Sequence, residues 1–407
     1  MTTVMNTGRN VFFDNLRSLM VLLVLVFHSG ASYSSAVEFW PFHDRNFSGI
    51  IDIFMFLCDV FMMSVLFFIA GYFALPNMQK KGAWSFVKGK LKRLGIPWLI
   101  ITIIVLPLID FFHYYRLQSA QLLPATGLFE YWILCMKKIV EFKTGWIDMS
   151  AYWNMTENFY QRYMWFISLL LAMFIAHALL NKLMSCLTKK SITESKQSDK
   201  KNSIYKSMAV TSGIMILLFG IVRLAIYPEF MGSGWFSLGN ILQFQLGKLV
   251  LYAGFFSLGI YAFSRKWFTG NAGFGKAWIW AIICFCLFGF NMLVLKNLKS
   301  PETAVFGYKI AFSVLYPLWT LSFLGFFVSL AYKFWNRQTK MNSNLTENSY
   351  NMYLVHYIIP FILPVFLAKL NINVLIKFGI VSIVTIIFSY IFSKYIMMPV
   401  SRLSFKE

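Results

Sequence analysis

Ten long apolar runs recur along the chain, and each is separated from the next by a more polar segment. A helix needs about 20 predominantly apolar residues to cross the roughly 30 Å of hydrocarbon in a bilayer. The sequence therefore predicts an all-α integral membrane protein with about ten transmembrane helices. The predicted spans are residues 12–33, 50–75, 94–113, 164–184, 207–227, 238–263, 276–298, 307–334, 348–369 and 374–396.

The amino-acid composition supports the membrane class. Hydrophobic residues make up 58% of the chain and charged residues only 13%, whereas soluble domains contain about 25% charged residues. The formal net charge of +21 raises the question of nucleic-acid binding. The basic residues, however, concentrate in short segments between apolar runs, which is the positive-inside pattern of membrane proteins. We therefore expect the lipid bilayer, and no nucleic acid, as a partner.

The charge distribution also predicts how the helices are oriented. Every second gap between spans is basic, and the alternate gaps hold a mixed set that includes many of the acidic residues. Because cytoplasmic loops carry an excess of Lys and Arg, the basic gaps and both termini are predicted to be cytoplasmic. The basic set comprises Lys80, Lys81, Lys88, Lys90, Lys92, Arg93, Lys189, Lys190, Lys196, Lys200, Lys201, Lys206, Arg265, Lys266, Lys333, Arg337 and Lys340. We expect a single polytopic domain over residues 1–407.

Two gaps are longer than the rest. Residues 185–206 are polar and basic, which is typical of a flexible cytoplasmic linker. Residues 114–162 form an outer segment rich in Trp, Tyr and Phe, and Leu128–Phe142 within it has the pattern of an interfacial amphipathic helix. These aromatic side chains either anchor the protein at the membrane interface or form a platform for a sugar ring. The sequence leaves both interpretations open.

The sequence lacks the motifs of several common kinds of site. The five cysteines show no spacing that indicates a disulfide or a metal clamp, and Cys284 and Cys286 are two residues apart, so they do not share a helix face. The sequence contains no Walker loop, G-x-S-x-G elbow, H-E-x-x-H motif or Rossmann glycine pattern. We expect no metal ion.

The first predicted helix carries the clearest ionisable pair inside a span. Arg17 and His28 are separated by eleven positions, or about three helical turns, so they project from one face about 16 Å apart along the axis. Asp14 lies one turn from Arg17 and is placed to pair with it. Ionisable residues within a span usually mark a functional site. The alternative is that Arg17 reaches the lipid headgroups and His28 is a hydrogen-bonded core residue.

Two further groups of candidates follow. Lys90 and Arg93 lie at i, i+3 at the cytoplasmic end of the third span, where two cations on one face suit phosphate groups. Ordinary positive-inside charge in contact with lipid phosphates is the alternative. The remaining intramembrane candidates are His356, in the ninth span, and Asp59, His177, Arg223 and Lys248. Each of these alone is more often a bundle-stabilising residue than a catalyst.

Several segments together resemble the membrane acyltransferase-3 family. The first is D-N-L-R with R-x10-H, which contains Asp14, Arg17 and His28. It is followed in order by FFIAGYF (Phe67–Phe73), K-x-x-R with GIPW (Lys90, Arg93, Pro97), MWFISLLL around Trp165 and SYNMYLVH (Ser349–His356). The GYF and GIP segments and IVRLAIYP in the fifth span are most similar to the branch that succinylates periplasmic glucans. One position departs from the family, because Lys90 stands where the family has Arg and so lacks the bidentate guanidinium fork.

The resemblance implies transfer of an acyl group, acetyl or succinyl, from cytoplasmic acyl-coenzyme A to a hydroxyl of an extracytoplasmic carbohydrate, in the cytoplasmic (inner) membrane. In that reaction His28 would be the general base, and Arg17, Lys90 and Arg93 would orient the donor. The alternative is a transporter or flippase, in which the same polar face would line a substrate path. A transporter is expected to show internal repeats and paired Gly/Pro breaks in corresponding halves, and the sequence shows neither.

Overall fold

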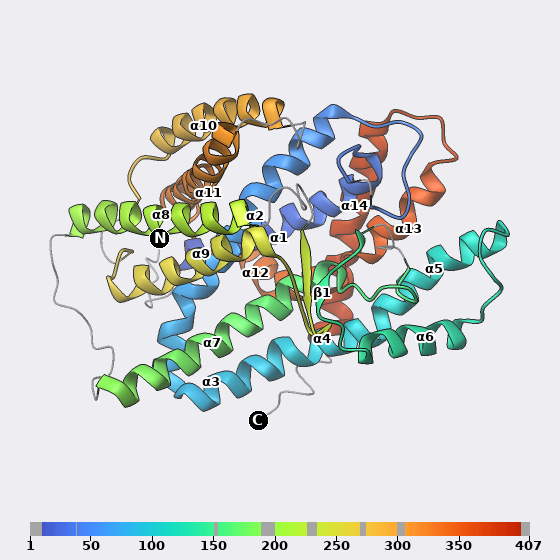
Figure 1. The fold of residues 1–407 in the computed structure, drawn as a ribbon, viewed down its shortest axis with the longest axis horizontal. Coiled ribbons are helices and arrows are strands. Elements are labelled where there is room, and N and C mark those ends of the chain that lie inside the picture. Colours follow the sequence, from blue (N-terminus) through green and yellow to red (C-terminus); the bar gives the residue numbers. More distant parts are fainter. Residues whose placement is uncertain are drawn as a thin grey trace.

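A computed structural model of the chain describes residues 10–37, 39–149, 154–188, 200–225, 234–268, 274–298 and 306–399. The helices are α1 (Val11–Gly30), α2 (Gly49–Lys81), α3 (Ala83–Lys90), α4 (Ile96–Ile100), α5 (Leu106–Ser119), α6 (Leu128–Val140), α7 (Trp165–Thr188), α8 (Lys200–Ala225), α9 (Leu246–Ser264), α10 (Ala277–Leu298), α11 (Phe306–Phe334), α12 (Lys340–Val355), α13 (Ile358–Leu367) and α14 (Val374–Phe392). Three short strands are β1 (Gly145–Trp146), β2 (Trp235–Leu238) and β3 (Leu242–Gln245) (Figure 1).

The predicted membrane class is confirmed. Among the described residues, eight helical segments are long and apolar enough to span a bilayer, and α12 with α13 makes a ninth if the bent pair is one span. A shorter apolar stretch, Lys206–Val222, lies within α8. Each of the ten predicted spans falls on one of these segments. The total of ten and the cytoplasmic position of the termini stay predictions, and Lys196 of the predicted linker lies outside the described residues.

Two predicted spans are wrong in detail. Residues 348–369 do not form one straight helix, because α12 and α13 meet at an angle of 64°. The sixth span was expected to begin at residue 238, but α9 begins at Leu246 and the residues before it form a hairpin. Positive φ at Gly239 (61°) and Asn240 (59°) is the backbone of a type I′ turn, which explains why the chain reverses there.

The hairpin belongs to a small antiparallel sheet in the order β1-β2-β3, with Gly145 opposite Ser237 and Trp235 opposite Gln245. Its side chains Ser237 and Gln243 are buried. Non-helical backbone is tolerated in a membrane protein where it is buried in protein or lines a cavity. The sheet therefore indicates a protein-enclosed region at the start of α9.

Helix α9 is held tightly against α2 by two glycines. A Cβ added at Gly71 would lie 2.0 Å from the carbonyl oxygen of Phe256, and one at Gly259 would lie 2.1 Å from that of Phe68. Small residues at a helix crossing let the backbones approach closely, which is a principal source of packing in membranes. The crossing places Lys248, at the start of α9, beside Asp59 of α2.

Helix α1 runs through the middle of the bundle and contacts α2, α11, α12 and α14 (Figure 1). Polar side chains join it to two of these helices: Ser18 Oγ lies 3.2 Å from Thr346 Oγ1 of α12, and Ser29 Oγ donates to Thr385 Oγ1 of α14 at 3.3 Å. Interhelical hydrogen bonds of this kind set the rotation of a helix about its axis. They hold the face of α1 that carries Arg17 and His28 against the bundle.

Candidate active site

The structure brings His28 and His356 together, although the sequence places them 328 positions apart. His28 is in the last turn of α1, and His356 is at the break between α12 and α13. His356 Nε2 lies 3.1 Å from His28 Nδ1, and His356 is fully buried, whereas His28 is partly exposed. His28 Nδ1 also lies 3.0 Å from the carbonyl oxygen of Val24.

The break between α12 and α13 leaves backbone carbonyl groups without a partner in the helix, and side chains form hydrogen bonds with two of them. His356 Nδ1 lies 2.6 Å from the carbonyl oxygen of Tyr353, and Tyr163 Oη donates to that of Leu354 at 2.7 Å. Tyr353 Oη in turn donates to the carbonyl oxygen of Tyr163. Carbonyls at a helix end need such partners when they are buried. The break therefore connects α12 to the start of α7 and orients the His356 ring.

His28 lines a pocket of about 150 Å³. The pocket walls are largely aromatic, and its polar groups are few. The aromatic lining is Phe27, Phe39, Trp40, Tyr160, Tyr163, Trp165, Trp235 and Tyr353, and the polar lining is His28, Asp59, Arg162 and Gln245. A mostly apolar cavity with a small number of convergent polar groups is the usual form of a substrate site.

Trp40 is held at this pocket by the loop that joins α1 to α2. Its Nε1 donates to Ser32 Oγ at 3.0 Å, and its ring lies 6.4 Å from that of His28. The same loop is attached to α14 by an ion pair between Asp44 and Lys377, 2.7 Å apart with both side chains buried. The sequence showed no pattern that would assign Trp40 to the site, because the contact depends on how the loop between α1 and α2 folds back.

An ion pair also reaches the pocket from α2 and α9. Lys248 Nζ lies 2.5 Å from Asp59 Oδ2, and the Asp59 side chain is 48% exposed. Both residues were predicted candidates, and the structure pairs them. Asp59 lies well inside α2 and is one of the residues that line the pocket. Its carboxylate is therefore placed to contact a ligand bound in the pocket.

The opposite end of α1 carries a cluster of cations. Arg17 Nη2 lies 3.2 Å from Asp14 Oδ1, which is the predicted pairing. Lys90 is close enough to Arg17, Lys81 and Arg93 to interact with their charges. Its ammonium group sits 3.8 Å from the centroid of the Phe174 ring. The structure thus places Arg17 near the predicted Lys90 and Arg93 pair and adds Lys81. We call Arg17, Lys81, Lys90 and Arg93 the cationic cluster.

Helix α12 connects the cationic cluster with the pocket that His28 lines. Tyr350 Oη donates to the carbonyl oxygen of Arg93 at 2.8 Å, six positions before His356. Arg93 lies in a π-helical turn, Leu91–Gly95, inside the long segment that runs from α3 to α5. Such turns are frequent at functional sites.

These features can be compared with known proteins. The family model of the acyltransferase-3 group, described as an acyltransferase domain, matches residues 10–394. The chain belongs to the acyltransferase-3 family. It is therefore a multi-pass membrane acyltransferase, as the resemblance implied. Two similar curated proteins are both named glucans biosynthesis protein C, from Escherichia coli strains SMS-3-5 / SECEC and K12; they are 24% and 23% identical over 364 residues, which cover 86% of this chain and 81% of each relative. No solved structure matches the chain.

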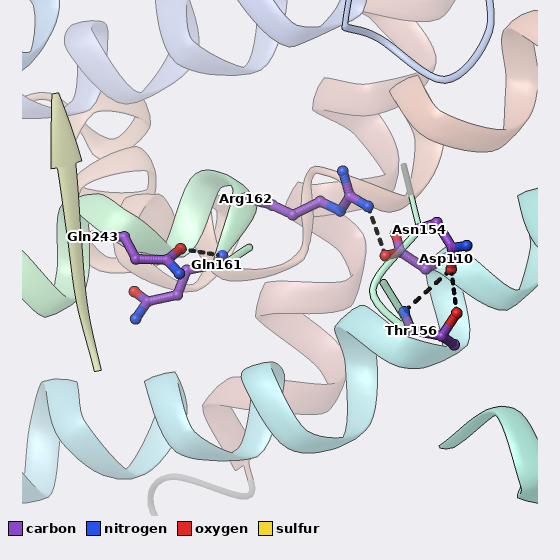
Figure 2. A network of polar contacts seen from close by, with 6 residues as sticks. All are labelled: Asp110, Asn154, Thr156, Gln161, Arg162 and Gln243. Carbon is purple, nitrogen blue, oxygen red and sulfur yellow. Dashed lines mark hydrogen bonds and ion pairs between the residues drawn. The ribbon is translucent and has the colours of Figure 1, made fainter. Parts of the chain in front are cut away.

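Arg162 is a residue of this acyltransferase that the sequence analysis missed. Figure 2 shows its side chain extending from the segment before α7 to Asp110 of α5, where the two charged groups are 2.6 Å apart and neither side chain is exposed. Its φ of 52° is unusual for a residue other than glycine. The predicted fourth span begins at 164, so Arg162 falls at the end of the segment 114–162 and was not among the candidates. The Asp110 carboxylate inside the third predicted span was the signal that could have indicated a partner.

A pair of buried glutamines holds the backbone on which Arg162 sits. The Gln161 backbone N–H donates to Gln243 Oε1 at 2.7 Å (Figure 2). Gln161 Nε2 donates to the carbonyl oxygen of Asn240 at 2.9 Å. Gln243 Nε2 donates to the carbonyl oxygen of Phe159 at 3.0 Å. The hairpin of β2 and β3 is thereby joined to the start of α7. This connection explains how a non-glycine residue keeps a positive φ beside the pocket.

The segment 114–162 contributes the helix α6, at the place where the sequence predicted a helix over Leu128–Phe142. Trp132 Nε1 donates to the carbonyl oxygen of Ile103 at 2.8 Å. Two other residues of α6, Tyr131 and Cys135, are buried. Burial, assisted by the charge of Asp110, raises the pKa of the Cys135 thiol to about 12. The interfacial depth of α6 stays a prediction.

The other predicted candidates differ in their placement. Trp165 lines the pocket and stacks against Tyr252, with ring centroids 5.6 Å apart. His177 packs against Phe256 with ring centroids 6.3 Å apart and does not line the pocket. Arg223 belongs to α8, and its side chain lies outside the described residues. In the described ranges no three or more His, Cys, Asp or Glu side chains are grouped so that they would hold a metal ion.

Proposed function

We propose that this acyltransferase moves an acetyl or succinyl group from acyl-coenzyme A at the cytoplasmic face to a hydroxyl of a carbohydrate on the outer side of the cytoplasmic membrane. The observation that carries the proposal is that α1 and α12 each join the cationic cluster to the pocket that contains His28. One end offers charges suited to a phosphorylated donor, and the other offers a base in an aromatic pocket.

The donor assignment rests on charge and depth. Coenzyme A carries several phosphate groups, and a cluster of Arg and Lys at a predicted cytoplasmic end binds them through charge-assisted hydrogen bonds. Lys90 is positioned by its contact with the Phe174 ring. Arg93 is exposed, so its guanidinium is accessible to a ligand.

The acceptor assignment rests on the chemistry of the pocket. Aromatic faces such as Trp165 and Trp235 suit the apolar faces of a sugar ring, and the half-exposed Asp59 carboxylate suits its hydroxyl groups. The similar proteins from Escherichia coli are named for glucan biosynthesis. A glucan is therefore the first acceptor to test.

The reaction needs a base and no covalent enzyme intermediate. The acceptor oxygen attacks the thioester carbonyl carbon, and His28 removes the hydroxyl proton as the new C–O bond forms. The C–S bond then breaks, and His28 returns the proton to the departing coenzyme A thiolate. Arg162 is the cation that lines the same pocket, and its charge favours the oxyanion that develops between these steps.

Inverted membrane vesicles test both the reaction and its direction. The glucan is enclosed in the lumen, which corresponds to the outer side, and acyl-coenzyme A with a labelled acetyl or succinyl group is added outside. We expect label on the enclosed glucan. Labelling only of glucan added outside the vesicles would contradict the proposed direction, and absence of any acylated glucan would contradict the acceptor.

His28→Asn tests the proposed base in the same assay. Asn retains a polar group of similar size but cannot accept the proton, so transfer should fall by about 10²–10⁴-fold, with acyl-coenzyme A binding unchanged. His177→Asn is the matched control, because His177 lies outside the pocket. Near-normal transfer by His28→Asn with saturating acceptor would remove His28 from the chemistry.

A further inference from the structure

The contacts of the two histidines determine which ring nitrogen carries each proton. The carbonyl oxygen of Tyr353 can only accept a hydrogen bond, so His356 Nδ1, 2.6 Å away, is the donor. His356 is fully buried, and burial of an isolated charge is costly, so its imidazole is neutral. Its Nε2 then carries a lone pair.

The same reasoning extends to His28. Its Nδ1 faces two acceptors, the Nε2 lone pair of His356 at 3.1 Å and the carbonyl oxygen of Val24 at 3.0 Å. A nitrogen placed between two acceptors must carry the proton. His28 Nε2 is consequently the unprotonated nitrogen.

We infer that His356 is a positioning residue that holds His28 in the tautomer with Nε2 free to act as the base. This inference rests on the proposed function, in which His28 removes the acceptor proton. His356 takes the place that a carboxylate occupies in a Ser-His-Asp triad, with a neutral imidazole and a backbone carbonyl as the orienting groups.

The surroundings of His356 support a fixed orientation. Its ring lies 5.0 Å from that of Tyr163 and 5.5 Å from that of Tyr353. Tyr163 Oη donates to the carbonyl oxygen of Leu354, and Tyr353 Oη donates to the carbonyl oxygen of Tyr163. A continuous helix would use the Tyr353 carbonyl in its own hydrogen-bond ladder. The break makes that carbonyl available to the imidazole.

The proton balance of the step is simple. His28 Nε2 receives the hydroxyl proton, so the His28 ring becomes an imidazolium while Nδ1–H remains shared with His356 Nε2 and the Val24 carbonyl. No proton needs to move to His356. When His28 returns the Nε2 proton to the coenzyme A thiolate, the starting tautomer is restored.

Solid-state ¹⁵N NMR of histidine-labelled protein in lipid tests the tautomer directly, with His28 assigned by the signals lost in His28→Asn. We expect a protonated Nδ1 and an unprotonated Nε2 on His28. His356→Phe keeps a buried ring but removes the acceptor, and should lower kcat by about 10²-fold with both KM values unchanged. His356→Gln places an amide oxygen near the lost Nε2 and should recover most of kcat.

Three outcomes would overturn the inference: a protonated Nε2 on His28 in the unmodified protein, an unchanged kcat in His356→Phe, or a His356→Gln variant as slow as His356→Phe. His177→Phe is the matched control and should retain normal kcat. The NMR result does not depend on turnover, so it decides the tautomer even if the proposed acyl transfer is not found. If His356→Phe fails to fold, His356→Gln and the spectra still decide the question.

Discussion

Arg162 and Asp110 form an ion pair with 2.6 Å between their charged atoms, and neither side chain has any exposed surface. Breaking such a pair from one side leaves an uncompensated charge in a low-dielectric interior. Asp110→Asn should therefore lower the free energy of unfolding by about 3–5 kcal/mol, measured by denaturation in detergent. The pair also fixes Arg162 beside the pocket, so transfer should fall as well.

A surface pair provides the control for this prediction. Lys138 and Glu141 are 2.7 Å apart but are 32% and 46% exposed. Lys138→Gln should cost less than about 1 kcal/mol. Equal destabilisation by the two substitutions would show that the buried pair has no special role.

The crossing of α2 and α9 predicts a strong effect of a single methyl group. In Gly71→Ala the new Cβ would meet the Phe256 backbone at 2.0 Å, which no side-chain rotation can relieve. Overpacking of this kind should cost about 1–3 kcal/mol or more of stability and should displace Lys248 from Asp59. Gly289→Ala in α10 is the control, because nothing lies within 4 Å of the position that its new Cβ would take. Equal unfolding midpoints for the two variants would contradict the close approach.

The thiol of Cys135 should be inert to alkylating reagents. Only the thiolate reacts, and a pKa raised to about 12 keeps the thiol protonated at neutral pH, so labelling should rise only as the pH approaches that value. Labelling is measured in a variant that lacks the other cysteines. Gly127→Cys, at an exposed position in the same outer segment, should react readily at pH 8 and from outside the cell. Rapid labelling of Cys135 at pH 8 would show that α6 does not bury it.

The cationic cluster predicts separable losses of donor binding. Lys90→Ala and Arg93→Ala should each weaken acyl-coenzyme A binding by roughly 1–3 kcal/mol, the scale of a hydrogen bond to a charged group. Arg93 should matter more, because its guanidinium can bind phosphate through two hydrogen bonds. Binding is measured by calorimetry at low and high salt.

Lys88→Ala is the matched control for the cluster. Lys88 is exposed on the same helix and is not among the charges that act on Lys90. It should bind the donor normally. Unchanged affinity in the Lys90→Ala, Arg93→Ala double variant would place the donor elsewhere.

The sequence alone was sufficient for the membrane class, the approximate position of the apolar helices and the family. Bilayer thickness imposes a length on every apolar run, and this constraint is local, so it can be read from composition within a window of about 20 residues. The spacing of Asp14, Arg17 and His28 was readable for the same reason, since all three lie on one uninterrupted helix.

Tertiary structure decided which distant residues meet. His28 and His356 are joined because α12 breaks at its end, and Arg162 reaches Asp110 because buried glutamines hold a backbone conformation that the sequence does not signal. The hairpin before α9 lies within an apolar run, and its strand β2 also pairs with β1, about 90 positions earlier in the chain. Contacts of this kind depend on the packing of whole helices, and no local pattern of residue types encodes them.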